Sequence, residues 1–175
     1  NMYCMFSGCS QLKEINVRNF DTGNVNDMGY LFRGCKNLSS IDVSNFNTSH
    51  VKGMTAMFSN CTNLQSLNLS TFNTAKVEFM DYMFADCKNI TSLNLSNFNT
   101  VKVKSMMAMF NGCERLTSLD LSNFYISDNT DTTCMFYRCN QLQIIRLVNC
   151  NQKTIEKIKL ALKEARIENQ VKLIY

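Results

Sequence analysis

The sequence predicts an α/β repeat solenoid, with a curved parallel sheet on its concave side and short helices on its convex side. One observation behind this prediction is that a phenylalanine, followed three residues later by a cysteine, returns at one constant interval, as from Phe6 to Phe32 and from Phe32 to Phe58. Another is that each unit joins a segment of strand-like alternation to a segment of helix-like spacing. In addition, the tail at residues 151–175 abandons the repeat, which predicts a C-terminal cap made of a helix and a strand.

The repeat is carried by columns of residues that keep one chemical character. The phenylalanine column comprises Phe6, Phe32, Phe58, Phe84, Phe110 and Phe136, and the cysteine column comprises Cys9, Cys35, Cys61, Cys87, Cys113 and Cys139. A single unit cannot bury its apolar face alone, so we expect successive coils to stack like side chains on like. Residues 1–150 are predicted to form the solenoid and residues 151–175 its cap, within one domain. Because the chain begins within a repeat, we expect the longer protein to continue upstream.

Each unit contains a segment with the pattern of a strand that is buried on one side. In LTSLDLSNF, residues 116–124, Leu119 and Leu121 alternate with the polar Asp120 and Ser122. Alternation with a period of two is typical of a strand with one buried face. We therefore expect six parallel strands, one in each coil.

The segments between the strands have the apolar spacing of a short helical face, as in VNDMGYLF at residues 25–32. Side chains that can accept hydrogen bonds from the free N–H groups of a helix start precede four of these segments; they are Asp21, Asn47, Asn73 and Asn99. The residues directly before the cysteines are Gly8, Gly34, Asn60, Asp86, Gly112 and Arg138. Five of these six tolerate the left-handed conformation that commonly ends a helix.

The tail has a different pattern from the repeats. Ile155, Ile158, Leu162 and Ala165 stand at helical spacing, and a short apolar segment follows at residues 171–174. The last coil of a solenoid exposes an apolar edge, which a helix with a polar outer face and one further strand would cover.

The repeat pattern LxxLxLxxF resembles the leucine-rich repeat, with phenylalanine where that family usually has a buried asparagine. More narrowly, LDLSNFNT joined to VxxMxxMFxxC is similar to the BspA-like leucine-rich repeats of bacterial surface proteins, over residues 2–150. This resemblance implies a curved solenoid with a role in adhesion or partner binding, located at the cell surface or secreted. A cytoplasmic location stays open.

The regular cysteine column favours packing over chemistry. Zinc requires ligands that converge from short paired spacings such as CxxC, and the chain has none. We interpret the column as buried free thiols that pack under the phenylalanine column. Cys4 and Cys134 share a column with alternating large and small residues and are interpreted as packing spacers. The redox state of Cys4, Cys134 and Cys150 stays open, including a bridge within the last coil.

Composition and motifs argue against several classes of function. The net charge of +4 includes no basic stripe that would indicate nucleic-acid binding. No apolar run approaches the roughly 18 to 20 residues that span a bilayer. None of the motifs GxSxG, HExxH, Walker A or GxGxxG is present, and translated repeats do not supply a convergent catalytic site. We expect a monomer that is not an enzyme and has no cofactor.

One segment breaks the repeat pattern, because YISDNTDTT at residues 125–133 has polar residues at the apolar positions. We interpret it as a polar loop near the cap. A cation site at Asp128 and Asp131 is the alternative, although two carboxylates without an EF-hand pattern are few for calcium.

The outward strand positions are the candidates for ligand binding. They are Asn16, Arg18, Asp42, Asn68, Asn94, Asp120 and Arg146. Rows of serines flank them, and the face lacks the tyrosine or tryptophan anchors that are common in interfaces. A face that is merely solvated is therefore the alternative.

These features predict a non-catalytic binding module of a bacterial surface or secreted protein, which adheres to a protein or glycan of a host or neighbouring cell. The alternatives are a structural spacer and an intracellular scaffold without a dedicated ligand.

Overall fold

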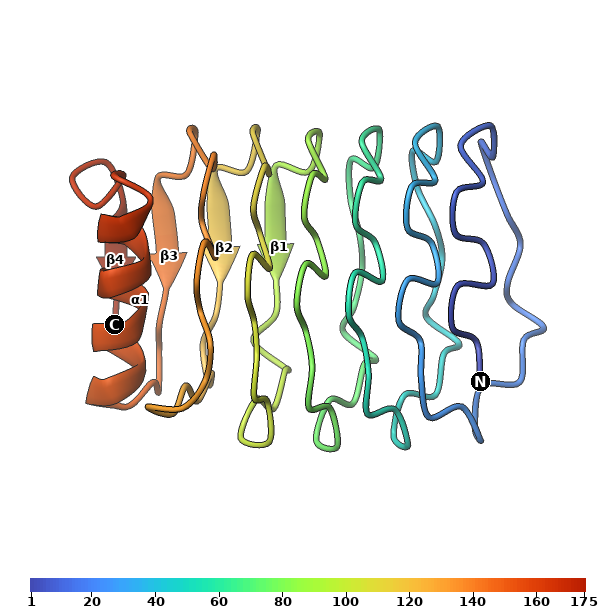
Figure 1. Cartoon of the computed structure of the whole chain (residues 1–175), viewed down its shortest axis with the longest axis horizontal. Coiled ribbons are helices and arrows are strands. Elements are labelled where there is room, and N and C mark those ends of the chain that lie inside the picture. Colours follow the sequence, from blue (N-terminus) through green and yellow to red (C-terminus); the bar gives the residue numbers. More distant parts are fainter.

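The computed structural model describes all residues from 1 to 175, which form a solenoid of stacked coils (Figure 1). In the second coil, residues 27–35 run along one side and residues 40–44 along the opposite side. We call these two sides of the stack the turn side and the sheet side. The N-terminus lies at one end of the stack, and helix α1 covers the other end.

The sheet side holds four parallel strands in the order β1-β2-β3-β4. Their bounds are Ser92–Asn94 for β1, Ser118–Asp120 for β2, Ile144–Arg146 for β3 and Lys172–Ile174 for β4. Leu93 pairs with Leu119, and Leu119 with Ile145, so the register advances by one repeat at each step. β4 comes from the tail and extends the sheet beyond the last repeat.

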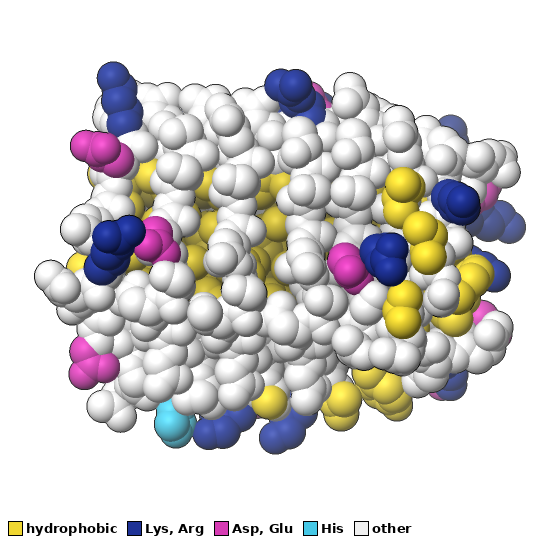
Figure 2. All heavy atoms as spheres, turned by 180° about the vertical axis from the view of Figure 1, so that it is seen from behind, with side chains coloured by type: hydrophobic (Ala, Val, Ile, Leu, Met, Phe, Trp, Pro, Cys, Tyr) yellow, Lys and Arg dark blue, Asp and Glu magenta, His cyan; other side chains and the backbone are white.

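The expectation of six repeat strands is wrong for the first three coils. The segments at Ile41 and Leu67 still pack against the core on the sheet side. Figure 2 shows the outer surface of this side. Between these two coils the sheet side has one backbone bond near the strand position, from the N–H of Gln65 to the carbonyl oxygen of Ser39 (3.1 Å). Backbone hydrogen bonds between strands are not needed there, because hydrogen bonds on the turn side already set the distance between coils.

The expectation of helices on the turn side is also wrong, because this side consists of overlapping four-residue turns. In the second coil, the N–H groups of Leu31, Arg33 and Cys35 each donate to the carbonyl oxygen three residues earlier. Tyr30 and Gly34 have φ angles of 59° and 73°, as the third residue of a type II turn requires. Left-handed residues four positions apart cannot belong to an α-helix.

The other N–H groups of the turn side bond to the next coil. Those of Met28, Tyr30, Phe32 and Gly34 donate to the carbonyl oxygens of Gly53, Thr55, Met57 and Ser59, at distances of 2.7–3.0 Å. The same four bonds join every pair of neighbouring repeat coils, and we call them the turn-side ladder. Each donor meets its acceptor only when the repeat length is constant, which explains the strict period.

Two columns of the turn side are left-handed in all six coils. The first is the column before the cysteines, with φ between 57° and 78°, which confirms the predicted conformation and extends it to Arg138. These residues end turns, not helices. The second column has φ between 53° and 59° and comprises Cys4, Tyr30, Ala56, Tyr82, Ala108 and Cys134. The interpretation of Cys4 and Cys134 as packing spacers is wrong, because both side chains are exposed, and it missed the backbone role of this column.

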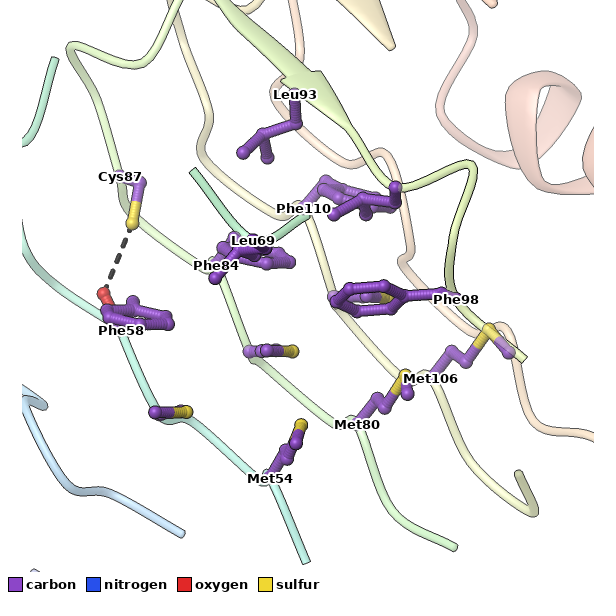
Figure 3. Packing of buried hydrophobic residues seen from close by; sticks show 14 of the residues in the cluster. Met54, Phe58, Leu69, Met80, Phe84, Cys87, Leu93, Phe98, Met106 and Phe110 are labelled. Atoms are coloured by element: carbon purple, nitrogen blue, oxygen red, sulfur yellow. Dashed lines mark hydrogen bonds between the residues drawn. The ribbon is translucent and has the colours of Figure 1, made fainter. Parts of the chain in front are cut away.

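The phenylalanine and cysteine columns form the centre of the core. Successive phenylalanine rings stack with centroids 5.6–6.1 Å apart and interplanar angles of 3–14°. The thiol of Cys87 donates to the carbonyl oxygen of Phe58 in the preceding coil, at 3.1 Å (Figure 3). Equivalent bonds of 3.0–3.2 Å are made by Cys35, Cys61, Cys113 and Cys139. The prediction of buried free thiols is confirmed for these five, whereas Cys9 in the first coil is exposed.

A column of buried threonines links the coils at the lower edge of the stack as it is drawn in Figure 1. The Thr74 hydroxyl accepts from the Asn99 N–H at 2.8 Å and donates to the Asn99 carbonyl oxygen at 3.0 Å. Thr22, Thr48 and Thr100 repeat this pair of bonds. The residues directly before these threonines are Asp21, Asn47, Asn73 and Asn99. The side-chain oxygen of each accepts a hydrogen bond from the backbone N–H two positions later, at 3.0–3.1 Å. Their predicted acceptor role is confirmed, although they begin turns and not helices.

The tail forms α1, Gln152–Glu164, and then β4. The Asn151 side chain accepts from the Thr154 N–H at 2.8 Å and caps the helix start. The buried Thr154 hydroxyl accepts from the Ile126 N–H at 2.9 Å, which ties the helix to the end of the stack. With 13 residues, α1 is too short to cross a membrane, and the structure has no other helix.

Replacement of Thr74 by valine, which keeps the side-chain shape but not the hydroxyl, is expected to lower the free energy of unfolding by about 1–3 kcal/mol, because Asn99 loses two hydrogen bonds. Thr74→Ser keeps the hydroxyl and is expected to cost less. Urea unfolding followed by circular dichroism measures both variants. Equal losses would show that the methyl group, and not the hydroxyl, stabilises the stack.

Burial also makes the column thiols unreactive. It raises the pKa of Cys35 to about 11 and the pKa of Cys87 and Cys139 to about 12. The thiolate is the reactive species, so both low access and a raised pKa slow its modification.

Treatment of the native protein with a disulfide reagent at pH 8 is therefore expected to label the exposed Cys4, Cys9 and Cys134. The five buried column cysteines should react only after unfolding in guanidinium chloride. Mass spectrometry of proteolytic peptides identifies the labelled positions. Rapid labelling of Cys87 in the folded protein would contradict the buried column.

Candidate functional site

The outward surface of the sheet side, which we call the sheet face, has two polar ridges with an apolar furrow between them (Figure 2). In the last coils, Ser92 and Ser118 belong to one ridge, and Asn94 and Asp120 to the other. These residues line a hollow of about 170 Å³ together with Leu93, Leu119, Ile144 and Arg146. The furrow arises because alternate residues of each strand point into the core.

The structure places six of the predicted ligand-binding residues in one row along this face, and Arg18 lies beside that row. Asn94, Asp120 and Arg146 are direct register partners in β1, β2 and β3. At the other end of the row, the guanidinium of Arg18 lies 3.1 Å from the Asp42 carboxylate. All members of the row are exposed except Asp120, which is half-buried.

The amide and carboxylate side chains of this row also have a structural role. One oxygen of each accepts the backbone N–H two residues later, at 3.0–3.1 Å; the residues are Asn16, Asp42, Asn68, Asn94 and Asp120. This Asx turn directs the chain out of the strand position. It also holds each side chain in one orientation, and in Asn16, Asn68 and Asn94 it leaves the amide NH2 group available to a ligand.

The charges of the row are paired at its two ends. Asp42 lies beside Arg18, and the Arg146 Nε lies 3.7 Å from an Asp120 oxygen. Hydrogen bonds from the Ser44 hydroxyl and N–H, together with Arg18, lower the pKa of Asp42. Oppositely charged side chains sit next to each other towards both ends of the face in Figure 2. Because the middle of the row is neutral, the row attracts neither anions nor cations over a long range.

A larger hollow of about 480 Å³ lies at the edge of the sheet face, where the loop that follows the turn side leads into the strand segment of each coil. Its lining is entirely polar and comprises Gln65, Ser66, Asn89, Thr91 and Arg115. We call it the edge hollow. Among these residues, only Ser66 belongs to the rows of serines that flank the predicted ligand-binding residues. The others stand in columns whose residue type changes from coil to coil, so the repeat pattern gives no signal for them.

The segment interpreted as a polar loop, residues 125–133, instead continues the turn side, because Asp131 forms a backbone bridge with Ser105 and Thr130 is buried. The two carboxylates of the alternative cation site have separate partners. Asp128 pairs with Lys153 of α1, and Asp131 accepts the Thr133 N–H at 2.9 Å. Hydrogen bonds from Thr133 lower the pKa of Asp131.

Comparison with known proteins gives one family match. The family model described as "Mycoplasma protein of unknown function, DUF285" matches residues 1–93 and 89–173. No curated protein sequence matches the chain. The narrower resemblance to BspA-like repeats stays a prediction.

A solved structure with some similarity is a leucine-rich repeat protein from Bacteroides ovatus. It is 18% identical, with a TM-score of 0.32, over 82% of this chain and 51% of that chain. The chain thus spans about half the length of that protein. A likeness this weak says nothing about a ligand or partner.

The Asx turns predict how the row tolerates substitution. Asn68→Ala removes the acceptor for the Ser70 N–H and is expected to lower the free energy of unfolding by about 0.5–1.5 kcal/mol. Asn68→Asp keeps the acceptor and is expected to cost less. The comparison is made in 1 M salt, where the screening length is about 3 Å, so that repulsion between the new carboxylate and Asp42 has little effect. Urea unfolding compares the two. If the alanine variant is as stable as the unchanged protein, the row has no structural role.

Proposed function

The chain belongs to the family described as Mycoplasma protein of unknown function, DUF285, and we propose that it is a non-catalytic module whose sheet face binds a macromolecular ligand. The observation that supports this most directly is the row of side chains oriented by Asx turns. A group that is already fixed loses little conformational freedom on binding, so more of its interaction energy contributes to affinity.

The furrow supports the proposal because it provides more than one point of contact. A hollow of about 190 Å³ lies at the start of the face beside Asn16, Arg18 and Asp42. Another hollow, of about 170 Å³, lies near its end beside Asn94, Asp120 and Arg146. A long ligand that lies along the furrow could contact both, and linked weak contacts combine into a higher overall affinity.

The acidic groups of the face support binding over catalysis. A general acid or base works best when its pKa lies near the working pH. The pKa of Asp42 is lowered by Ser44 and Arg18, which keeps this carboxylate ionised at neutral pH. Asp120 lies next to Arg146 and also accepts the Ser122 N–H. Such groups are suited to holding a ligand in place.

We further propose that the module acts at the cell surface or after secretion, in adhesion to a host or neighbouring cell, and that it is monomeric. The resemblance of LDLSNFNT and VxxMxxMFxxC to repeats of bacterial surface proteins supports the location. α1 supports a closed end, because Ile158, Ala161 and Leu162 of the helix are buried and its exposed residues are polar apart from Leu160. A capped end does not add further coils from a second molecule.

Two other functions have some support. The pairing of Arg18 with Asp42 and of Arg146 with Asp120, together with the lack of aromatic residues on the face, favours a spacer that binds nothing. The buried column cysteines donate to carbonyl oxygens as thiols, an arrangement that is compatible with a reducing compartment and hence with an intracellular scaffold.

The binding proposal predicts that the purified chain recognises at least one member of an array of matrix proteins and glycans. Ser92→Arg places a long side chain on the ridge of the furrow and is expected to weaken that binding about tenfold or more, because it obstructs the ligand. Asn24→Arg is the matched control, since it adds the same charge at a column that holds lysine in other coils. Surface plasmon resonance measures both variants.

Equal weakening by both variants would point to charge alone and would contradict binding in the furrow. Absence of any ligand on the array would favour the spacer.

A further inference from the structure

We propose that the edge hollow, lined by Gln65, Ser66, Asn89, Thr91 and Arg115, is a binding site for a saccharide that carries a carboxylate. The inference rests on the proposed function and names the chemical class of its ligand. The hollow lies on three successive coils, with two lining residues from the third coil, two from the fourth and Arg115 from the fifth.

The backbone at this hollow has an unused donor and an unused acceptor. At the equivalent position between the fourth and fifth coils, the Thr117 N–H donates to the Thr91 carbonyl oxygen at 2.8 Å. The next coils have the same bond from Gln143 to Thr117, at 2.9 Å. Between the third and fourth coils this bond is missing, as it is between the first two coils, so the Thr91 N–H and the Gln65 carbonyl oxygen have no partner within the chain.

The side chains of the hollow are mostly free as well. Those of Gln65, Ser66 and Thr91 make no hydrogen bond within the protein, and Asn89 has a single long contact, from Arg115 at 3.5 Å. Together they offer two hydroxyls and two amides, each of which can donate and accept. A ligand with many hydroxyl groups matches this set, whereas an apolar ligand would leave it unsatisfied.

Arg115 gives the hollow a positive charge that no carboxylate of the protein neutralises. Among the six arginines of the chain, Arg18, Arg138 and Arg146 pair with carboxylates. The neighbouring Glu114 is occupied by Lys88 at 2.9 Å and by Arg138 at 3.4 Å. A planar guanidinium binds a carboxylate through two parallel hydrogen bonds, which are stronger than bonds between neutral groups.

The size of the hollow favours a saccharide over a single acidic side chain. At about 480 Å³, it falls within the range of roughly 300–1,000 Å³ that is typical of small-molecule sites. A glutamate side chain could neutralise Arg115 but would leave the hydroxyls, the amides and the Thr91 N–H without partners. A sugar acid places its carboxylate against Arg115 and its ring hydroxyls against the other groups.

The test is a titration of the chain with sodium glucuronate, followed by NMR shifts of the Ser66 and Thr91 amides. Glucose provides the neutral control and inorganic phosphate the anion without a sugar. We expect glucuronate to bind more tightly than either control. Arg115→Gln is expected to weaken the binding about tenfold or more through loss of the charge-assisted pair. The equivalent positions in the first and last coils, Gln11 and Gln141, already hold glutamine, so the fold accepts this substitution.

Arg33→Gln is the matched control, because Arg33 lies over the Tyr30 ring on the turn side. It should leave glucuronate binding unchanged. The inference is overturned if glucuronate does not bind, if glucose or phosphate binds equally well, or if Arg115→Gln has no more effect than Arg33→Gln.

The outcome can be separated from that of the proposed function. If glucuronate fails to bind while an array ligand binds and is blocked by Ser92→Arg, the site is wrong and the module still binds through its furrow. If glucuronate binds through Arg115 while no macromolecule binds, the site stands and the proposed macromolecular ligand is wrong.

Discussion

The turn-side ladder is the interaction on which the rest of the structure depends. Four N–H groups of each coil donate to carbonyl oxygens of the next coil, at every junction between repeat coils. These bonds fix both the distance and the register between coils, and they do so without a regular sheet over the first half of the stack. One inserted or deleted residue within a coil would shift every donor away from its acceptor, which accounts for a repeat length that never changes.

The composition of the core follows from this constraint. Coils held in one register bring each phenylalanine over its equivalent, which produces the stacked rings at 5.6–6.1 Å (Figure 3). The Phe58 carbonyl oxygen accepts both the Cys61 N–H, at 3.2 Å, and the Cys87 thiol. Cysteine suits the column because it is small and apolar and still offers a weak donor to that oxygen. Aromatic and sulfur columns are therefore consequences of stacking and need no role in chemistry.

The features of the surface differ in how far they could be predicted. The row along the sheet face could be predicted because strand alternation decides which side chains point outward, as for Asn94 and Asp120. The sequence could not show whether these side chains form Asx turns or serve a ligand, since both roles need the same amide or carboxylate. The edge hollow could not be predicted at all, because it depends on a missing backbone bond between Gln65 and Thr91 and on the position of Arg115 one coil further along.

The sequence by itself determined the coil length, the stacked columns and five of the six left-handed positions before the column cysteines, because equal spacing and the turn preferences of glycine, asparagine and aspartate are local properties. Only the tertiary structure decided that the turn side consists of overlapping turns. Apolar spacings of three and four residues suit both a helix and such turns, and the choice depends on acceptors in the next coil. The left-handed Tyr30 carries no local signal, and the Thr154 hydroxyl meets Ile126 only after α1 has packed onto the stack.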